Sequence, residues 1–386
     1  MNLFWCDLGE PSFDNYLQAS KLSIGPRHEY PAFRRSLYKW KAKVRSIGRQ
    51  ANLASGKSIA SRSSIQAAVT RFQPDVVYST ACDINGLWLL EDVLSYLPPE
   101  IPVVQHFLDF HPLYQRPAIE QSLRRLEHRL TEVWSLAKGL VPCIDEIVGR
   151  PTRHFPLFSC DIEFFKPGRG QTICPSKPIL TGNVWLPEMV CETVRLWQLA
   201  QDRILGLPPI DWYSNTFARQ SVASVPLDSA IRFKGFARAS KLAKLLSDAD
   251  LAVLPFNQRP YTRPEDEYTY HKDYSLYSLP SKLTEYCAAG LPVLCLGTKE
   301  TETARFVQEN QIGISIAVEE IGTARKRLFE FLNDQEFRQS CSENARNLAV
   351  REFAQPDYLR TLLREFEEAR TRLKKPAQRS PQASTI

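Results

Sequence analysis

The chain has 386 residues, which is too long for one ordinary hydrophobic core and predicts two domains or three. Hydrophobic residues make up 43% of it and charged residues 24%, a composition that excludes disordered and fibrous proteins. The net charge of +6 is modest, so it permits an anionic ligand or membrane surface, and we expect no nucleic-acid partner. No apolar run approaches the roughly 18 residues that span a bilayer, and the first residues, MNLFWCDLGEP, lack a signal-peptide pattern. We therefore expect a cytoplasmic protein, with the inner face of the membrane as a second place where it could act.

The nine cysteines indicate free thiols. Their number is odd, they are scattered along the chain, and no pair has Cys-x-x-Cys spacing. This pattern disfavours both a disulfide framework and a zinc site. We expect buried thiols in a reducing compartment and no metal.

Residues 31–49 (PAFRRSLYKWKAKVRSIGR) predict a basic amphipathic helix. One helical face gathers apolar residues, among them Phe33 and Trp40, and lysines and arginines occupy the rest. Such a helix could dock on an anionic membrane. The alternative is a helix that packs its apolar face on the core and leaves its basic face in water.

Short strand-like runs, separated by helical patterns, follow along most of the chain. The predicted strands are residues 75–79, 101–105, 179–181, 210–213, 231–233, 251–255 and 292–296. Helical patterns between several of them are typical of βαβ units, in which parallel strands alternate with helices. The sequence therefore predicts an α/β protein with doubly wound parallel sheets.

Two imidazoles and a carboxylate follow the strand predicted at 101–105, in the run HFLDFH. Side chains at the carboxyl end of a parallel strand face the crevice where ligands of such sheets bind. His106 is therefore a candidate catalytic base, with Asp109 and His111 as further candidates. The alternative for His106 is a histidine that is satisfied inside the core.

A stretch dense in proline and glycine, KPGRGQTICPSKP at 166–178, predicts the domain boundary, because the alternation of strands and helices begins afresh after it. We expect an N-terminal domain over 1–168 and a second domain over 169–355. A helix over 356–373 could return to the first domain, and residues 374–386 form a low-complexity tail that we expect to be disordered.

The segment 231–316 gives the clearest local predictions. The run SKLAKLLSDADLAVLPF predicts a helix over 241–247 and a buried strand after it. Asp248 and Asp250 have the spacing of paired metal ligands, but they lie at the amino end of the strand, away from the ligand crevice, so we favour a structural role. The long loop over 257–279 carries five tyrosines, which favours a lid or a contact with a sugar ligand, with a packing insertion as the alternative.

The short helix after this loop predicts an anion site. In SLPSKLTEYCAAGLPVL, Pro280 sets up a turn, Ser281 is placed to cap a helix, and Gly290 ends it before the next strand. A helix that starts at the carboxyl edge of a parallel sheet points free N–H groups into the crevice, which suits a diphosphate. Lys282 adds a positive charge, and Glu285, one turn later, could accept hydrogen bonds from a ribose. The alternative is an ordinary capped helix with a surface lysine and a surface glutamate.

This run, preceded by DADLAVLPF and followed by Glu302 and Gly313, closely resembles the donor-binding half of GT-B glycosyltransferases of the family-4 or group-1 type. The segment FPLFSCDIEFFKP also resembles the family's interdomain segment. The resemblance implies two Rossmann-like doubly wound domains facing each other across a cleft. The N-terminal domain, 1–168, would lie on the acceptor side, and the C-terminal domain, 169–355, would bind the sugar nucleotide. It implies retaining transfer of a sugar from a nucleoside-diphosphate sugar to a glycan or lipid-linked acceptor, in cell-surface or exopolysaccharide synthesis. It also implies no cofactor besides this co-substrate and no obligatory metal.

The resemblance assigns roles to particular residues. Lys282 and Ser281 would contact the diphosphate, and Glu285 would bind the ribose. In retaining transfer the departing diphosphate can take the acceptor proton, so Lys282 would act by stabilising negative charge on the leaving group. His106 matches a family histidine near the transferred sugar. The remaining donor-binding candidates are Gly182, Asn183, Tyr277 and Leu283.

Two departures from the family pattern leave other functions open. Tyr277 stands where many relatives have a second glutamate, and GNVWLPEMV at 182–190 lacks the arginine and lysine that many relatives have there. One alternative is a catalytically silent GT-B homologue that serves as a binding or scaffold partner of a transferase. A hydrolysing sugar-nucleotide epimerase on the same fold is the weaker alternative, because we find no convincing set of crevice carboxylates.

Overall fold

The computed structural model divides the chain into two compact units. Unit 1 comprises Met1–Pro156 and Leu362–Ile386, and unit 2 comprises Leu157–Thr361. The structure describes residues 3–6, 62–81, 84–108, 116–156, 159–168, 172–182, 184, 187–215, 223, 227, 229–255, 276–297, 300–317 and 321–374. The helix predicted at 31–49 and most of the loop at 257–279 therefore lie outside the described residues.

The limits of the units differ from the domain limits of 168 and 355 that we expected. Residues 157–168 belong to unit 2, where backbone hydrogen bonds fasten them. The N–H of Cys160 donates to the carbonyl of Phe353 at 2.9 Å, and that of Gly168 donates to the carbonyl of Ala289 at 3.1 Å. Proline and glycine mark a change of chain direction here, but the hydrogen bonds decide to which unit the segment belongs.

Unit 1 contains a five-stranded parallel sheet in the order β1-β2-β3-β4-β5. Its strands are β1 (Leu3–Cys6), β2 (Val76–Ser79), β3 (Val103–Phe107), β4 (Glu132–Ser135) and β5 (Arg153–His154). The helices described around it are α3 (Arg62–Phe72), α4 (Ile84–Leu94), α5 (Arg116–Leu126) and α6 (Val141–Val148), with 3₁₀ turns at Glu127–Arg129 and Lys138–Leu140. β1, β4 and β5 are not among the predicted strands, and β5 has only two residues, too few for any pattern.

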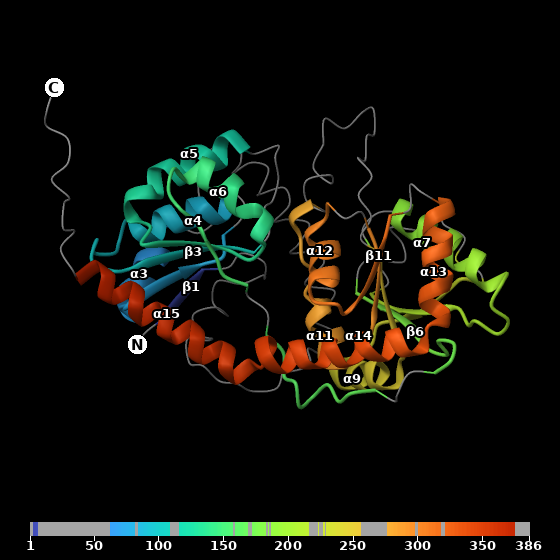
Figure 1. Cartoon of the computed structure of the whole chain (residues 1–386). Helices are drawn as coiled ribbons and strands as arrows, with labels where there is room; N and C mark the ends of the chain where they lie inside the picture. Colours follow the sequence, from blue (N-terminus) through green and yellow to red (C-terminus); the bar gives the residue numbers. More distant parts are fainter. Residues whose placement is uncertain are drawn as a thin grey trace, which may run out of the picture. The chain divides into compact units, whose positions relative to one another are not determined.

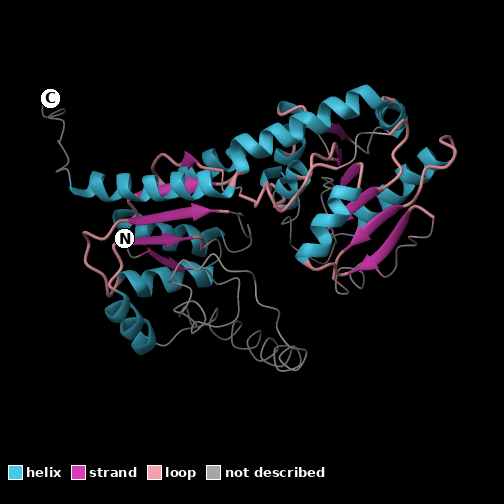
Figure 2. Ribbon diagram, turned by 90° about the horizontal axis from the view of Figure 1, so that it is seen from below, coloured by secondary structure: helices cyan, strands magenta, loops and turns pink. Residues whose placement is uncertain are grey.

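Unit 2 contains a six-stranded parallel sheet in the order β11-β10-β9-β6-β7-β8. Its strands are β6 (Pro178–Thr181), β7 (Ile210–Tyr213), β8 (Ile231–Gly235), β9 (Leu251–Pro255), β10 (Val293–Leu296) and β11 (Gly313–Ile316). Its helices are α7 (Pro187–Gln201), α9 (Ala239–Asp248), α11 (Lys282–Ala288), α12 (Glu302–Glu309), α13 (Ile321–Asn333) and α14 (Gln335–Leu348), followed by a π-helical turn at Ala349–Phe353. Parallel pairing throughout both sheets agrees with the predicted α/β class (Figure 2).

The sheet of unit 2 is covered on both faces, which explains why its central strands are uniformly apolar. Helices α7 and α13 lie on one face, and α11 and α12 lie on the other (Figure 1). Every residue of β6, β9 and β10 is buried. Strands buried on both faces lose the alternation of polar and apolar residues and appear as continuous hydrophobic runs.

Asp250, at the start of β9, holds the segment that leads into β6. Its carboxylate accepts hydrogen bonds from the N–H of Ser176 at 2.6 Å and from the N–H of Lys177 at 2.9 Å. The hydroxyl of Ser176 donates to it at 2.8 Å. The carboxylate therefore has the structural role that the sequence favours over metal binding.

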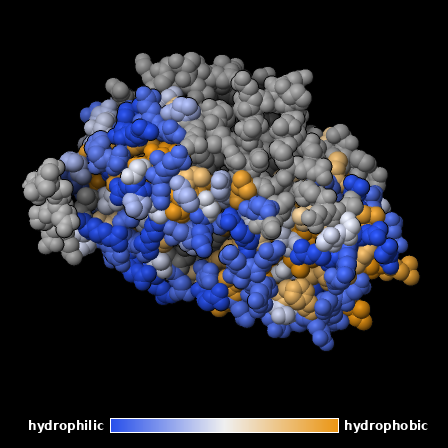
Figure 3. All heavy atoms as spheres, turned by 45° about the horizontal axis from the view of Figure 1, so that its top comes forward, coloured by the Kyte–Doolittle hydropathy of each residue, from blue (hydrophilic) through white to orange (hydrophobic). Residues whose placement is uncertain are grey.

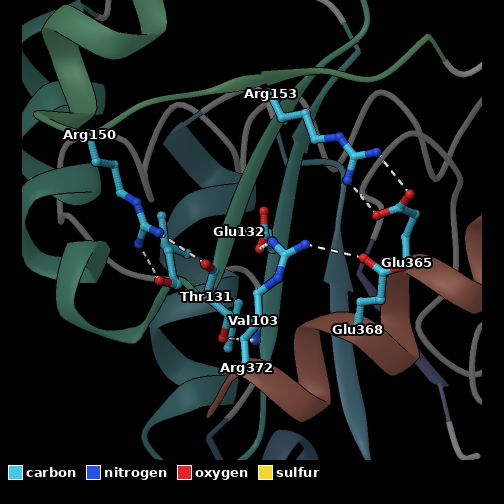
Figure 4. A network of polar contacts seen from close by, with 9 residues as sticks. Val103, Thr131, Glu132, Arg150, Arg153, Glu365, Glu368 and Arg372 are labelled. Carbon is cyan, nitrogen blue, oxygen red and sulfur yellow. Dashed lines mark hydrogen bonds and ion pairs between the residues drawn. The ribbon is translucent and has the colours of Figure 1, made fainter. Parts of the chain in front are cut away.

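The last helix, α15 (Gln355–Lys374), begins in unit 2 and ends in unit 1. Within unit 1, ion pairs fasten it to the ends of two strands (Figure 4). Glu365 accepts hydrogen bonds from both terminal nitrogens of Arg153, and Arg372 donates to Glu132. The bidentate bond from Arg153 lowers the pKa of Glu365.

The cysteines in the described part of the chain are free thiols, as expected. Four of them, Cys160, Cys287, Cys295 and Cys341, are buried. The expectation that all are buried is wrong for the other three: Cys191 is exposed, and Cys143 and Cys174 are half-buried.

Hydrophilic residues predominate over the described part of the face shown in Figure 3, with hydrophobic residues in smaller groups between them. No helix within the described ranges is long and apolar enough to cross a membrane.

Candidate functional site

The strand order of unit 2 reverses between β6 and β9, and this reversal marks a ligand-binding position. β6 pairs with β9 only at Pro178–Leu251 and Ile179–Ala252, whereas it stays paired with β7 as far as Thr181. β6 and β9 therefore separate toward their carboxyl ends. Ligands of open α/β sheets bind at such a point, because the connections that follow the two strands lead to opposite faces of the sheet.

Gly182 follows β6 and exposes its backbone at this point. Its φ is +78°, in the left-handed region that favours glycine. The N–H of Gly182 donates to the carbonyl of Tyr213 at 2.9 Å, and its carbonyl accepts from Nε1 of Trp212 at 2.9 Å. β7 thus fixes both backbone groups of Gly182, and the side on which a side chain would stand faces the side chain of Lys282. Asn183, the neighbouring candidate, lies outside the described residues.

α11 carries the predicted motif but does not begin as predicted. Ser281 is exposed, has helical angles (φ −56°, ψ −26°) and makes no side-chain capping bond. The first turn is closed by other bonds: the N–H of Leu283 donates to Pro280 O at 3.0 Å, and the hydroxyl of Thr284 donates to Ser281 O at 2.8 Å. The predicted cap is wrong because the turn that begins at Pro280 already gives Ser281 a helical conformation, whereas a capping residue needs an extended one.

The end of α11 confirms the prediction for Gly290. Its φ is +64°, and its N–H donates to Cys287 O at 2.9 Å. The N–H of Leu291 donates to Tyr286 O at 2.9 Å, which completes a Schellman motif. The helix therefore has a fixed length before β10 begins.

The side chain of Lys282 extends from the first turn of α11 to the loop after β6. A Cβ added to Gly182 would lie 3.7 Å from Lys282 Nζ and 3.8 Å from Lys282 Cε, so the ammonium lies against the backbone of Gly182. Burial lowers the pKa of Lys282 to about 8, and the neighbouring Glu285 opposes this shift. A partly desolvated ammonium gains free energy from an anionic ligand, because such a ligand stabilises its charged form.

The other candidates of this motif have different surroundings. Glu285 is half-buried, one turn after Lys282 and close enough to raise the pKa of its ammonium. Leu283 is 1% exposed, so its side chain belongs to the core and its placement gives no support to donor binding. Tyr277 is half-buried just before α11. The structure thus brings together Gly182, Lys282 and Glu285 at the carboxyl ends of the central strands of unit 2.

His106 lies inside β3 rather than after it. Its side chain is fully buried, and the hydroxyl of Tyr78 is 2.8 Å from its Nδ1. The ring of Trp134 lies 5.7 Å from the imidazole between centroids, and the ring of Phe155 lies 5.8 Å away. Burial lowers the pKa of His106 to about 3.

This placement differs from the crevice-facing position that we expected for His106. β3 runs on to Phe107, two residues beyond the predicted strand, and every residue of this strand is buried, so His106 lies in the core. The structure favours the alternative of a core histidine. Asp109 and His111 lie outside the described residues, so their roles remain predictions.

Residues 204–348, within unit 2, match the family described as glycosyl transferases group 1. Over this range the chain is similar to the group 1 glycosyl transferases. Its match covers less than half of the sequence, and no curated protein matches the chain.

Several solved structures have a similar fold over a larger part of the chain than the family match covers. Anabaena Alr3699/HepE, solved in complex with UDP and glucose, has a TM-score of 0.55 at 12% identity over 80% of this chain and 81% of its own. A glycosyltransferase from Rickettsia africae has a TM-score of 0.54 at 12% identity over 80% of each chain. Sucrose-phosphate synthase from Thermosynechococcus elongatus has a TM-score of 0.55 at 12% identity over 80% of this chain and 76% of its own. The predicted GT-B fold is confirmed, and the family match supports glycosyltransferase activity.

Glu302 and Gly313, which follow the motif in the sequence, have structural roles in unit 2. A Cβ on Gly313 would lie 1.9 Å from the carbonyl oxygen of Val293, so only glycine allows β11 to pair with β10 here. Glu302, in the first turn of α12, is 8% exposed and pairs with Arg305 at 2.7 Å. Neither residue needs a ligand to explain its presence.

The sequence did not predict the residues that hold the end of β6 in place. Trp212 fixes the carbonyl of Gly182, and the hydroxyl of Tyr286 bonds to Thr181. Each of these aromatic residues lies in an apolar stretch that is equally typical of plain core packing, so the sequence carried no signal for the polar role.

Proposed function

We propose that the chain transfers a sugar from a nucleoside-diphosphate sugar to a glycan or lipid-linked acceptor, with retention of configuration and without an obligatory metal ion. One observation carries this proposal. The ammonium of Lys282 lies against the exposed backbone of Gly182, where β6 and β9 separate. A cation beside an exposed glycine at the carboxyl ends of parallel strands suits a phosphate group.

The position of Glu285 supports a nucleotide rather than a free phosphate. It lies one helical turn after Lys282 on the same helix, so a ligand whose phosphates contact Lys282 would bring its ribose hydroxyls to the carboxylate. Proteins of the same fold support UDP as the first nucleotide to test: Alr3699/HepE was solved with UDP-glucose, and the pneumococcal O-GlcNAc transferase GtfA with UDP and GlcNAc.

Catalysis in this proposal rests on the leaving group. As the bond from the sugar to the diphosphate breaks, negative charge grows on the diphosphate oxygens, and the Lys282 ammonium stabilises it. The departing diphosphate then accepts the proton of the acceptor hydroxyl, so no protein base is required. The buried, weakly basic His106 of unit 1 fits this scheme, because it is not placed to take that proton.

A cell-surface or exopolysaccharide glycan is the acceptor that we propose. S. aureus TarM, which shares the fold with a TM-score of 0.55, was solved in complex with fondaparinux, α-GlcNAc-glycerol and UDP. We also propose that the protein contacts an anionic membrane through residues 31–49 and is active at the inner face of that membrane. This part of the proposal rests on the sequence alone.

A transfer assay with a panel of UDP-, GDP- and ADP-sugars tests the proposal. We expect Glu285→Gln and Lys282→Ala each to lower kcat/KM for the donor by about tenfold or more, with unchanged circular dichroism. Glu309→Gln, an exposed glutamate of α12, is the matched control. EDTA should leave the rate unchanged. Full activity in both site variants would contradict the proposed site, and loss of activity in EDTA would contradict metal independence.

Two sequence features favour the silent-homologue alternative: Tyr277 stands in place of a glutamate, and GNVWLPEMV at 182–190 lacks an arginine and a lysine. Calorimetry separates the two functions. A folded protein that binds none of UDP, GDP or ADP would favour a scaffold role, whereas binding without transfer to any glycan acceptor would point to a donor site that has lost its chemistry.

A further inference from the structure

The backbone N–H of Thr181, the last residue of β6, points into the gap where β6 and β9 separate. Successive N–H groups of a strand point to opposite neighbours, and that of Gly182 donates to Tyr213 on β7. The N–H of Thr181 therefore points toward β9, but the pairing of β6 with β9 ends at Ile179 and Ala252. Thr181 is 2% exposed, so bulk water does not reach this N–H, and without a partner it would destabilise the fold.

The hydroxyl of Tyr286 is the hydrogen-bond partner of this N–H. Tyr286 lies in α11 and is fully buried. Its hydroxyl oxygen accepts a hydrogen bond from the N–H of Thr181 at 2.9 Å and lies 3.0 Å from Thr181 Oγ1. A helix that follows β9 in the chain is therefore bonded to the end of β6, across the gap that the strands leave open.

Two successive turns of α11 thus contact two successive residues at the end of β6. Lys282 and Tyr286 are four residues apart, so they share one face of the helix. Tyr286 bonds to Thr181, and the Lys282 side chain lies against Gly182. Any shift of α11 along β6 would move both contacts together.

We propose that Tyr286 is a positioning residue of the donor site. Its hydroxyl fixes α11 against the end of β6, so that the Lys282 ammonium and the Gly182 backbone approach one diphosphate from two elements of the fold. The diphosphate in this statement rests on the proposed function, whereas the link between α11 and β6 rests on the geometry alone. The aromatic ring of Tyr286 would fill the core equally well as phenylalanine, so the hydroxyl is the part of the side chain that this role requires.

Tyr286→Phe and Thr181→Val test this role, because each removes a hydroxyl and keeps the shape of the side chain. Thr181→Ser keeps the hydroxyl that Thr181→Val removes, so its Kd for UDP should equal that of the wild type. Ser315→Ala is the matched control: its buried hydroxyl bonds to Gly297 O at 2.8 Å at the far edge of the same sheet. For each purified full-length variant we would measure the unfolding midpoint, the Kd values for UDP and uridine, and amide hydrogen exchange without ligand.

We expect Tyr286→Phe to raise the Kd for UDP about tenfold and to change the Kd for uridine much less, because the phosphates need both α11 and Gly182 in place, whereas the ribose contacts α11 alone, through Glu285. Exchange of the Thr181 and Gly182 amides should rise by about the same factor, and Thr181→Val should show a smaller effect in the same direction. Ser315→Ala should lower the unfolding midpoint without changing the Kd for UDP.

The outcomes separate this role from the proposed function. Unchanged exchange at Thr181 and Gly182 in Tyr286→Phe would overturn the link, whatever the protein binds. Equal weakening of UDP and uridine would show a general structural role and would overturn positioning. A wild-type protein that binds neither UDP, GDP nor ADP would overturn the proposed function, and with it the donor part of this inference, even if the exchange result holds.

Discussion

Replacing Lys282 by methionine should make the protein more stable and its donor site weaker. Burial lowers the pKa of Lys282 from 10.5 to about 8. One pKa unit corresponds to about 1.4 kcal/mol, so the charged lysine destabilises the folded state at pH 7 by about 3 kcal/mol at most. Methionine has a similar length and no charge. We therefore expect Lys282→Met to raise the free energy of unfolding by about 1–3 kcal/mol, or the midpoint by about 5 °C.

The pH dependence gives this prediction its sign. The folded-state pKa of Lys282 lies below its unfolded value, so the unfolded chain binds more protons between about pH 8 and pH 10.5. Wild-type stability should gain from this group as the pH rises through that window. Lys282→Met lacks the group, so its advantage over the wild type should be complete at pH 7 and should shrink toward pH 10.

Denaturant unfolding at pH 7, 8.5 and 10 measures the difference, with Lys241→Met, an exposed lysine of α9, as the control. Calorimetry with UDP should show a Kd raised about 10- to 100-fold, the usual loss for a hydrogen bond to a charged group. Equal stability of wild type and Lys282→Met at pH 7, with parallel curves up to pH 10, would refute the argument that folding desolvates this ammonium.

Three further changes test other parts of the structure. Gly182→Ala forces a left-handed φ of +78° on a residue with a Cβ, so we expect a loss of about 1–2 kcal/mol in stability and weaker UDP binding, by thermal shift and calorimetry. Gly313→Ala brings a Cβ to 1.9 Å from a strand carbonyl, so we expect more than about 4 kcal/mol of destabilisation, visible as loss of soluble protein. Arg338→Met leaves the carbonyls of Phe331 and Thr172 without their buried donor, and we expect about 3 kcal/mol of destabilisation by denaturant unfolding with no effect on the Kd for UDP of the remaining folded protein. Near-wild-type stability in Gly313→Ala or Arg338→Met would contradict the packing described for unit 2.

The sequence predicts the parts of the fold whose signals are local. The buried strand β9 and the strand β7 have the bounds that their apolar runs predict, and Gly290 ends α11 as expected. Other features depend on context that no local pattern contains. β3 is two residues longer at its carboxyl end than predicted, and this extension carries His106 from the expected edge into the core. Similarly, Ser281 has the right spacing for a cap, but the preceding turn gives it a helical conformation.

Long-range contacts could not be predicted from spacing at all. The bond from Arg153 to Glu365 joins residues 212 positions apart, and the bond from Tyr286 to Thr181 joins residues 105 apart. The approach of Lys282 to Gly182 was expected only through the family resemblance, because a motif shared among relatives carries tertiary information that a single segment lacks.

A structure of the protein with bound UDP tests the central claim most directly. We expect both phosphates at the carboxyl ends of the unit 2 strands, with a phosphate oxygen about 3 Å from Lys282 Nζ and beside the backbone of Gly182, and with the ribose hydroxyls at Glu285. Phosphates bound at another edge of the sheet, with Lys282 and Glu285 both free of the nucleotide, would contradict it.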